Sequence, residues 1–296
     1  MSENHHGSYY IPSHSHWHIV GAIGLFLLGL GSINIFNGGI SGPILFIAGV
    51  TVLIYMFMGW MYDVIKESRS GLYDQQMLRT FRWGMFWFIV TDAAIFLAFI
   101  IGLWYFRFFT LSWLSYSGSA TVLDTGITHL LLWPNFEKAW PLINNPDPSL
   151  FPGPQQGLLL TGIPQLNLLL MISSAVTFLL AYIGVKKNKH ALLMTGLITT
   201  IALGILFTIF QIVEYHLAIT HYLITFTTGI YGSTVLTLIL IHLLHVIVAL
   251  IILCVVTIRS GLLHFDSQHY FAIQGTLWFW MLLVLAWIAA FFSIYM

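Results

Sequence analysis

Seven runs of about twenty mostly apolar residues follow one another along this chain, and they leave it few possible folds. An α-helix of about 20 apolar residues crosses the roughly 30 Å hydrocarbon core of a bilayer. A β-barrel is excluded because its strands are about ten residues long and alternate in polarity, whereas these runs are continuous. The sequence therefore predicts an all-α, polytopic membrane protein with seven transmembrane helices, at about 17–38, 43–62, 83–106, 164–185, 191–215, 229–257 and 270–295.

The charged residues and the single cysteine narrow the function classes further. Only 7% of the 296 residues are charged, and Lys+Arg and Asp+Glu number ten each, so no basic surface is available for nucleic acid. Cys254 is the only cysteine. Iron–sulfur clusters and thiolate-bridged copper centres need several thiolates, so the chain cannot hold either of them alone.

The positions of the cations predict the orientation in the membrane. Lys and Arg beside the spans are retained on the cytoplasmic side. We therefore expect a cytoplasmic N-terminus, with a retained polar tail that lacks the features of a secretory signal, and a periplasmic C-terminus. Eight cations fall on the cytoplasmic side, and Arg107 and Lys138 lie in or beside a long periplasmic loop at about 107–163; the eight are Lys66, Arg69, Arg79, Arg82, Lys186, Lys187, Lys189 and Arg259.

Asp92 and Glu214 are the two acids that the spans place inside the membrane. Asp92 lies ten residues beyond Arg82, hence about 15 Å deep, and its neighbours on the same helix face are apolar. Such an acid is either hydrogen-bonded to another helix or protonated, so a packing role and a proton-related role both stay open. For Glu214 we favour a structural hydrogen bond with Gln211, which lies one turn earlier.

His242 and His245 are spaced i and i+3, so they share one face of a helix. A haem or metal site would need further ligands from a facing helix, and no other span carries a histidine near mid-depth. We therefore interpret the two histidines as a structural polar pair that forms interhelical hydrogen bonds. No catalytic and no metal-binding residue is expected in this chain.

A third group of polar and aromatic residues lies where spans reach the cytoplasmic rim. Trp60 and Glu67 share one stripe of the second span, and Arg259, His264 and His269 lie on the same side of the membrane. These residue types can bind a phospholipid headgroup. From spacing alone this is the weaker interpretation, because tryptophan anchors helices at interfaces by default and cations follow the orientation rule.

Nine stretches, taken in order, carry a resemblance to a known family. They are YYIPSHSHWHIVGAIG, WMYDVIKES, FRWGMFWFIVTDAAIFLAF, GIPQLN, FTIFQIVEY, YGST, HLLHV, the run from Arg259 to His269, and LWFW through SIYM. Together they resemble subunit III of the heme-copper cytochrome c oxidases, over nearly the whole chain outside the long loop. Asp92 departs from that family's pattern, which usually has glutamate at this position.

The resemblance implies a subunit without haem or copper in a bacterial proton-pumping terminal oxidase. Its partners would be the catalytic subunit I, subunit II and membrane phospholipids, and the partner subunits would hold the haem and copper. It also implies two helices in residues 1–66, separated by a V-shaped lipid cleft from a five-helix bundle in residues 67–296. In this family the role is to stabilise the catalytic subunit, sustain proton uptake and limit inactivation during turnover, in the bacterial inner membrane.

The resemblance further implies that Trp60, Glu67, Arg259, His264 and His269 contact the cleft lipids, which makes the lipid interpretation the favoured one. Three alternatives remain open. Subunit III of a quinol oxidase is the nearest, although such subunits commonly have five spans. A stand-alone transporter could use Asp92 and Glu214 as a proton relay, and a membrane haem protein could use the two histidines as ligands.

Overall fold

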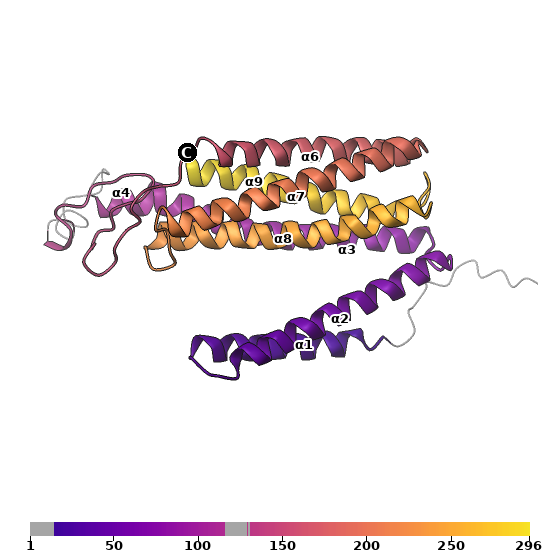
Figure 1. Ribbon diagram of the computed structural model, residues 1–296, viewed down its shortest axis with the longest axis horizontal. Helices are drawn as coiled ribbons and strands as arrows, with labels where there is room; N and C mark the ends of the chain where they lie inside the picture. Colours follow the sequence, from indigo (N-terminus) through magenta and orange to yellow (C-terminus); the bar gives the residue numbers. More distant parts are fainter. Residues whose placement is uncertain (1–14, 116–128, 130) are drawn as a thin grey trace, which may run out of the picture. The chain divides into compact units, whose positions relative to one another are not determined.

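The computed structural model describes residues 15–115, 129 and 131–296, and in these residues it contains helices and loops without a strand. Within these described residues, seven helical segments are long and apolar enough to cross a membrane, with α3, η1 and α4 forming a single span. The predicted all-α architecture with seven spans is thereby confirmed (Figure 1). The elements are α1 (Trp17–Phe36), α2 (Gly42–Arg69), α3 (Gln75–Tyr105), the π-helical turn η1 (Phe106–Thr110), α4 (Leu111–Leu114), α6 (Ile163–Lys186), α7 (His190–Thr220), α8 (Ile230–Gly261) and α9 (Phe271–Tyr295).

The chain divides into two compact units, Met1–Trp83 and Gly84–Met296. The first unit contains α1, α2 and the first turns of α3. The second contains the rest of α3 and all later helices.

Close packing of α1 against α2 organises the first unit. A Cβ atom added at Gly49 of α2 would lie 2.5 Å from the backbone nitrogen of Leu28 in α1, and one at Gly31 would collide with the backbone of Phe46. Glycines at such positions let two membrane helices approach closely. At one end of the pair, Trp17 Nε1 donates a hydrogen bond of 2.7 Å to Asp63 Oδ2, which fixes α1 to α2.

The helix that carries Asp92 is longer than the predicted span of about 83–106. It begins at Gln75 and continues through η1 and α4 to Leu114, a length of 40 residues. Asp74 Oδ1 accepts a hydrogen bond of 2.7 Å from the backbone N–H of Met77, so a polar cap starts the helix outside the apolar run. At 1.5 Å per residue such a helix measures about 60 Å, roughly twice the hydrocarbon core, so its ends extend beyond the membrane.

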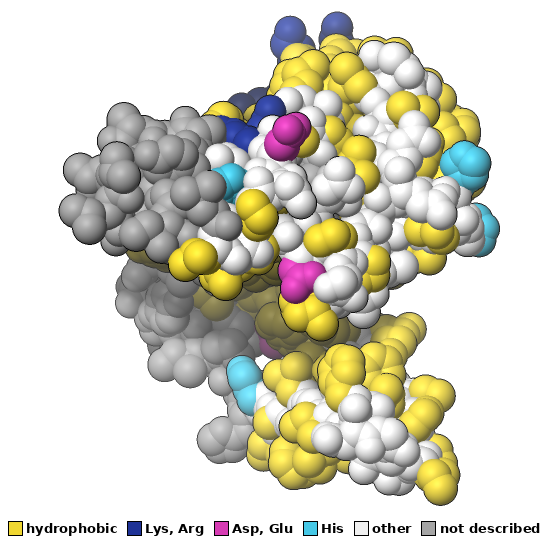
Figure 2. Space-filling view, turned by 90° about the vertical axis from the view of Figure 1, so that its left-hand side faces the viewer, with side chains coloured by type: hydrophobic (Ala, Val, Ile, Leu, Met, Phe, Trp, Pro, Cys, Tyr) yellow, Lys and Arg dark blue, Asp and Glu magenta, His cyan; other side chains and the backbone are white. Residues whose placement is uncertain are grey.

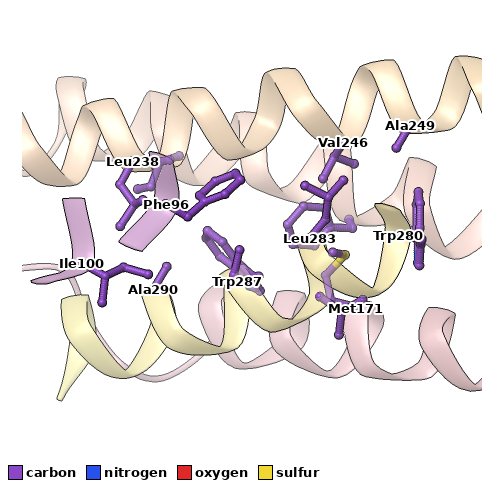
Figure 3. Close-up of a cluster of buried hydrophobic side chains, with 14 of the residues drawn as sticks. Phe96, Ile100, Met171, Leu238, Val246, Ala249, Trp280, Leu283, Trp287 and Ala290 are labelled. Carbon is purple, nitrogen blue, oxygen red and sulfur yellow. The ribbon is translucent and has the colours of Figure 1, made fainter. Parts of the chain in front are cut away.

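The core of the second unit is built around α9, which packs on both α6 and α8. Trp280 and Trp287 of α9 are fully buried, and Figure 3 shows them with Phe96 among aliphatic side chains of the neighbouring helices. Trp280 Nε1 donates a hydrogen bond of 3.0 Å to Ser174 Oγ of α6. This core holds the helices that carry the intramembrane polar residues.

The described part of the long loop, residues 131–162, folds against the turn that joins α7 to α8. Asn145 Nδ2 donates hydrogen bonds to the carbonyl oxygens of Phe151 (2.9 Å) and Thr228 (3.2 Å), while Leu142 and Leu158 are buried. Figure 2 views this end of the molecule, where charged side chains are few and hydrophobic ones lie between them. The long loop was predicted to begin at about residue 107, but the helix continues through α4 to Leu114. Ser115 is therefore the first described residue of the loop.

Candidate functional site

Asp92 of α3 and His245 of α8 form a hydrogen-bonded pair inside the apolar spans. Asp92 Oδ1 lies 3.0 Å from His245 Nε2, and the side chains are 7% and 22% exposed. The acid that has no partner on its own helix therefore finds one on another helix. Both residues were predicted to lie inside the membrane, but in separate polar groups.

The second ring nitrogen of His245 determines which protons this pair can hold. His245 Nδ1 lies 2.7 Å from the carbonyl oxygen of Ile241. A carbonyl oxygen only accepts hydrogen bonds, so Nδ1 must carry a hydrogen. The bond between His245 and Asp92 then contains a single proton, held either by a carboxylic acid that donates to neutral imidazole or by an imidazolium that donates to a carboxylate.

In both arrangements the pair is neutral as a whole. An isolated charge in the hydrocarbon region is costly, whereas a pair that shares a proton carries no net charge. Phe96 packs edge-on against the His245 ring at 5.3 Å, and Asp92 Oδ2 is buried without a hydrogen-bond partner among the described residues. Chemically, the pair can hold one proton and shift it between an acid and a base.

His242 forms a different contact. Its Nε2 lies 3.0 Å from the carbonyl oxygen of Leu283 in α9, so Nε2 carries the hydrogen of the neutral ring. The ring is buried and lies 4.9 Å, centroid to centroid, from Trp287. The two histidines thus bond to different helices, His245 to α3 and His242 to α9, and not to each other.

Glu214 of α7 lies in a buried cluster with three neutral polar side chains. Its contact with Gln211 is long, 3.4 Å from Gln211 Nε2 to Glu214 Oε2. Asn167 Nδ2 of α6 donates a shorter hydrogen bond of 3.0 Å to the same oxygen, and the Tyr295 hydroxyl of α9 donates to Oε1. Asn167 was missed as a site residue, although an amide within an apolar run is a detectable signal; a tyrosine at the end of a span, such as Tyr295, is too common to be one.

The lipid-binding residues predicted in the first unit lie on α2. Trp60 is 43% exposed. Glu67 Oε2 accepts a hydrogen bond of 2.7 Å from the Tyr73 hydroxyl, so its carboxylate is held in place by the segment that leads to α3.

The three predicted in the second unit lie where α8 ends and the connection to α9 begins. The Arg259 guanidinium lies 4.6 Å from the centroid of the Phe265 ring, and the backbone N–H of His264 donates to the carbonyl oxygen of Arg259. His269 Nδ1 lies 3.1 Å from Asp266 Oδ2. The hydrogen bond from His269, with those from the backbone N–H groups of Gln268 and His269, lowers the pKa of the Asp266 carboxyl.

No group of three or more His, Cys, Asp or Glu side chains that could hold a metal ion occurs in residues 15–115, 129 and 131–296.

Comparison with known proteins identifies the family to which the chain is similar. The family model described as cytochrome c oxidase subunit III matches residues 6–119 and 152–296. Proteins named cytochrome c oxidase subunit 3 are 28% identical in Locusta migratoria, over 100% of this chain and 98% of the relative, and 27% identical in Pisaster ochraceus, over 98% of each. The relative from Scyliorhinus canicula is 28% identical over 97% of this chain and 96% of its own. The family model leaves residues 1–5 unmatched, and also residues 120–151, which belong to the long loop before α6.

Proposed function

Because this chain belongs to the cytochrome c oxidase subunit III family, we propose that it is the non-redox subunit of a proton-pumping terminal oxidase. In this role it stabilises the catalytic subunit I, binds structural phospholipids and supports proton uptake. The observation that carries the proposal is the family match over both sides of the long loop, together with relatives of the same name over the full length. Haem and copper belong to the partner subunits.

The Asp92–His245 pair is the proposed contribution of this chain to proton uptake. An acid and a base that share one proton can accept a proton at one atom and release another, without a lasting net charge in the membrane. The Ile241 carbonyl keeps His245 Nδ1 protonated, so exchange is directed to the side of the ring that faces Asp92. The rings of Phe96 and Phe279 pack against the His245 ring, and such apolar surroundings strengthen a hydrogen bond within the pair.

For phospholipid binding we propose five residues. On the first unit, Trp60 offers an interfacial ring and Glu67 a fixed carboxylate; on the second, Arg259, His264 and His269 offer hydrogen-bond donors to a phosphate. The lipid-filled cleft implied by the family resemblance stays a prediction.

The membrane and the electron donor are part of the same proposal. Cation asymmetry supports a cytoplasmic N-terminus and a periplasmic C-terminus. The membrane we propose is a bacterial inner membrane, although the relatives named above are animal proteins. Seven spans, and relatives named cytochrome c oxidase, favour cytochrome c over quinol as the donor.

Purification of the tagged chain from its native membranes tests this function. We expect co-purifying oxidase subunits and a haem spectrum in the complex, and no Soret band in the chain once it is separated from them. A stable lone chain that transports a solute would contradict the proposal in favour of a transporter. A Soret band retained by the isolated chain would contradict it in favour of a haem protein ligated by His242 and His245.

A further inference from the structure

A second buried acid lies apart from the Asp92–His245 pair, in a setting that differs from it chemically. Glu214 is 4% exposed, and its partners Asn167 and Gln211 are fully buried. Asn167 comes from α6, Glu214 and Gln211 from α7, and Tyr295 from the last turn of α9. The cluster therefore joins three helices around a single carboxyl group.

Every hydrogen bond that the described residues make to this carboxyl comes from a neutral group. Asn167 Nδ2 and Gln211 Nε2 donate to Oε2 at 3.0 and 3.4 Å, and the Tyr295 hydroxyl donates to Oε1. Glu214 takes part in no ion pair within the described part of the chain. Ionisation of Glu214 thus places an uncompensated negative charge in the bundle, unlike a proton shift within the Asp92–His245 pair.

One atom of the cluster remains unused while Glu214 is ionised. Asn167 Oδ1 is buried and has no hydrogen-bond partner among the described residues. A carboxylate cannot donate to it, but a carboxylic acid can. A half-turn of the Asn167 amide would exchange its nitrogen and oxygen, so that the oxygen accepts the O–H of protonated Glu214. The cluster can therefore satisfy the carboxyl group in both of its protonation states.

We propose that Glu214 is a second proton-binding site of this protein, which exchanges one proton with the aqueous phase at the end of the bundle where α9 terminates. On release, the O–H bond of the acid breaks, its electron pair stays on the carboxylate, and the proton passes to water. Tyr295 offers the way out, because it touches Glu214, is only partly buried, and is followed by Met296, which is 52% exposed.

Among the described residues, the titratable groups beside Tyr295 are phenols, and one cation contacts the residue that follows it. Tyr222, beyond the end of α7, and Tyr231, in the first turn of α8, lie near Tyr295, and both phenols are uncharged at neutral pH. Arg107 of η1 donates to the backbone oxygen of Met296. The contact that α6 makes to Glu214 comes from the uncharged Asn167. Arg107 contacts Met296, the residue after Tyr295, and within the described residues it forms no ion pair with Glu214.

Infrared difference spectra of the intact purified protein, recorded between acid and alkaline pH, test this site. In the wild type we expect a carboxylic-acid C=O band that is lost at alkaline pH, and we expect Glu214→Gln to lack that band. Asp92→Asn is the matched control and should keep it. If the pH difference spectra of the wild type and of Glu214→Gln are the same in the carboxylic-acid C=O region, the proposal is overturned.

Tyr295→Phe is the second variant, and it retains the carboxyl while removing one donor. We expect the Glu214 band to persist with a shifted frequency, and an unshifted spectrum would overturn the proposal even if Glu214→Gln failed to assemble. The spectroscopic signal comes from Glu214 itself. Its absence is therefore distinguishable from failure of the oxidase role, which is read from co-purification.

Discussion

Asp92 and His245 illustrate how an acid is accommodated within a membrane span. The 3.0 Å contact supplies the acid with a base, and the Ile241 carbonyl sets the proton on the other side of the ring. The shorter side chain of aspartate, compared with the glutamate expected from the family resemblance, still reaches its partner here. The position of one proton, and not a fixed charge, distinguishes the states of this pair.

Replacement of Asp92 by asparagine separates its packing role from its proton role. The introduced amide can donate to the free Nε2 of neutral His245, so we expect assembly to persist and the stability to change by about 1 kcal/mol or less. Proton exchange through the pair is lost, so proton uptake by the complex should slow. If pumping stoichiometry, turnover lifetime and assembly all stay unchanged, the acid is merely tolerated.

The energetic coupling of the pair can be measured with a double-mutant cycle. Each single change, Asp92→Leu or His245→Leu, leaves one buried polar group without its partner, which costs about 1–3 kcal/mol. The double variant removes both groups, so its loss should be smaller than the sum of the single losses. Thermal dissociation of the purified complex provides the measurement, and strictly additive losses would contradict an interaction.

At the scale of the helices, side chains at the contacts determine which elements stay together. In the first unit, α1 and α2 meet through glycines that admit no Cβ atom. In the second unit, long side chains connect α3 to its neighbours, including Trp104 Nε1, which donates to Ser293 Oγ of α9 at 2.7 Å. Small residues thus bring the first two helices together, whereas polar and aromatic contacts attach α3.

Two glycines of α1 form a matched pair for testing the contact between α1 and α2. A Cβ atom at Gly31 would meet the backbone of Phe46, whereas one at Gly29 would meet nothing within 4 Å. Gly31→Ala should therefore destabilise the helix pair by about 1–3 kcal/mol, and Gly29→Ala should be neutral or slightly stabilising. Resistance of the purified protein to heat or protease measures the difference. Equal behaviour of the two variants would contradict the packing described here.

The connection between α8 and α9 should respond to acid. The lowered pKa of Asp266 means that its carboxylate contributes stability above its ordinary pKa of about 3.9, and that this contribution is lost as the pH falls through the lower folded value. We expect amide exchange at Gln268 and His269 to accelerate in that acidic range, because both N–H groups donate to Asp266. Asp266→Asn should abolish this pH dependence, and an unchanged dependence in that variant would assign it to another group.

Predictions from the sequence succeed and fail along physical lines. The seven spans were predictable because lipid requires long apolar helices. The start of α3 at Gln75 was not, since polar residues outside the membrane form helix without any hydropathy signal. The Asp92–His245 contact could not be predicted either, because it depends on the rotation of α3 and α8 about their axes, which residue spacing within one helix leaves free.

For the molecule as a whole, the family assignment and the positions of the polar residues suggest a division of tasks between this chain and its partner subunits. The match to cytochrome c oxidase subunit III covers both units of the chain, and the intramembrane polar residues are concentrated in the second unit. A chain that holds protons and lipids, but no redox centre, would influence how long and how fast its partner works without determining whether it works. The effect should thus be seen in kinetics and not in the haem spectrum.

Oxygen consumption by the purified oxidase, followed to inactivation with and without this chain, tests that claim most directly. We expect an unchanged haem spectrum in both preparations, with a shorter catalytic lifetime and slower proton uptake when the chain is absent. Identical lifetimes and proton uptake, or loss of haem on removal of the chain, would contradict it.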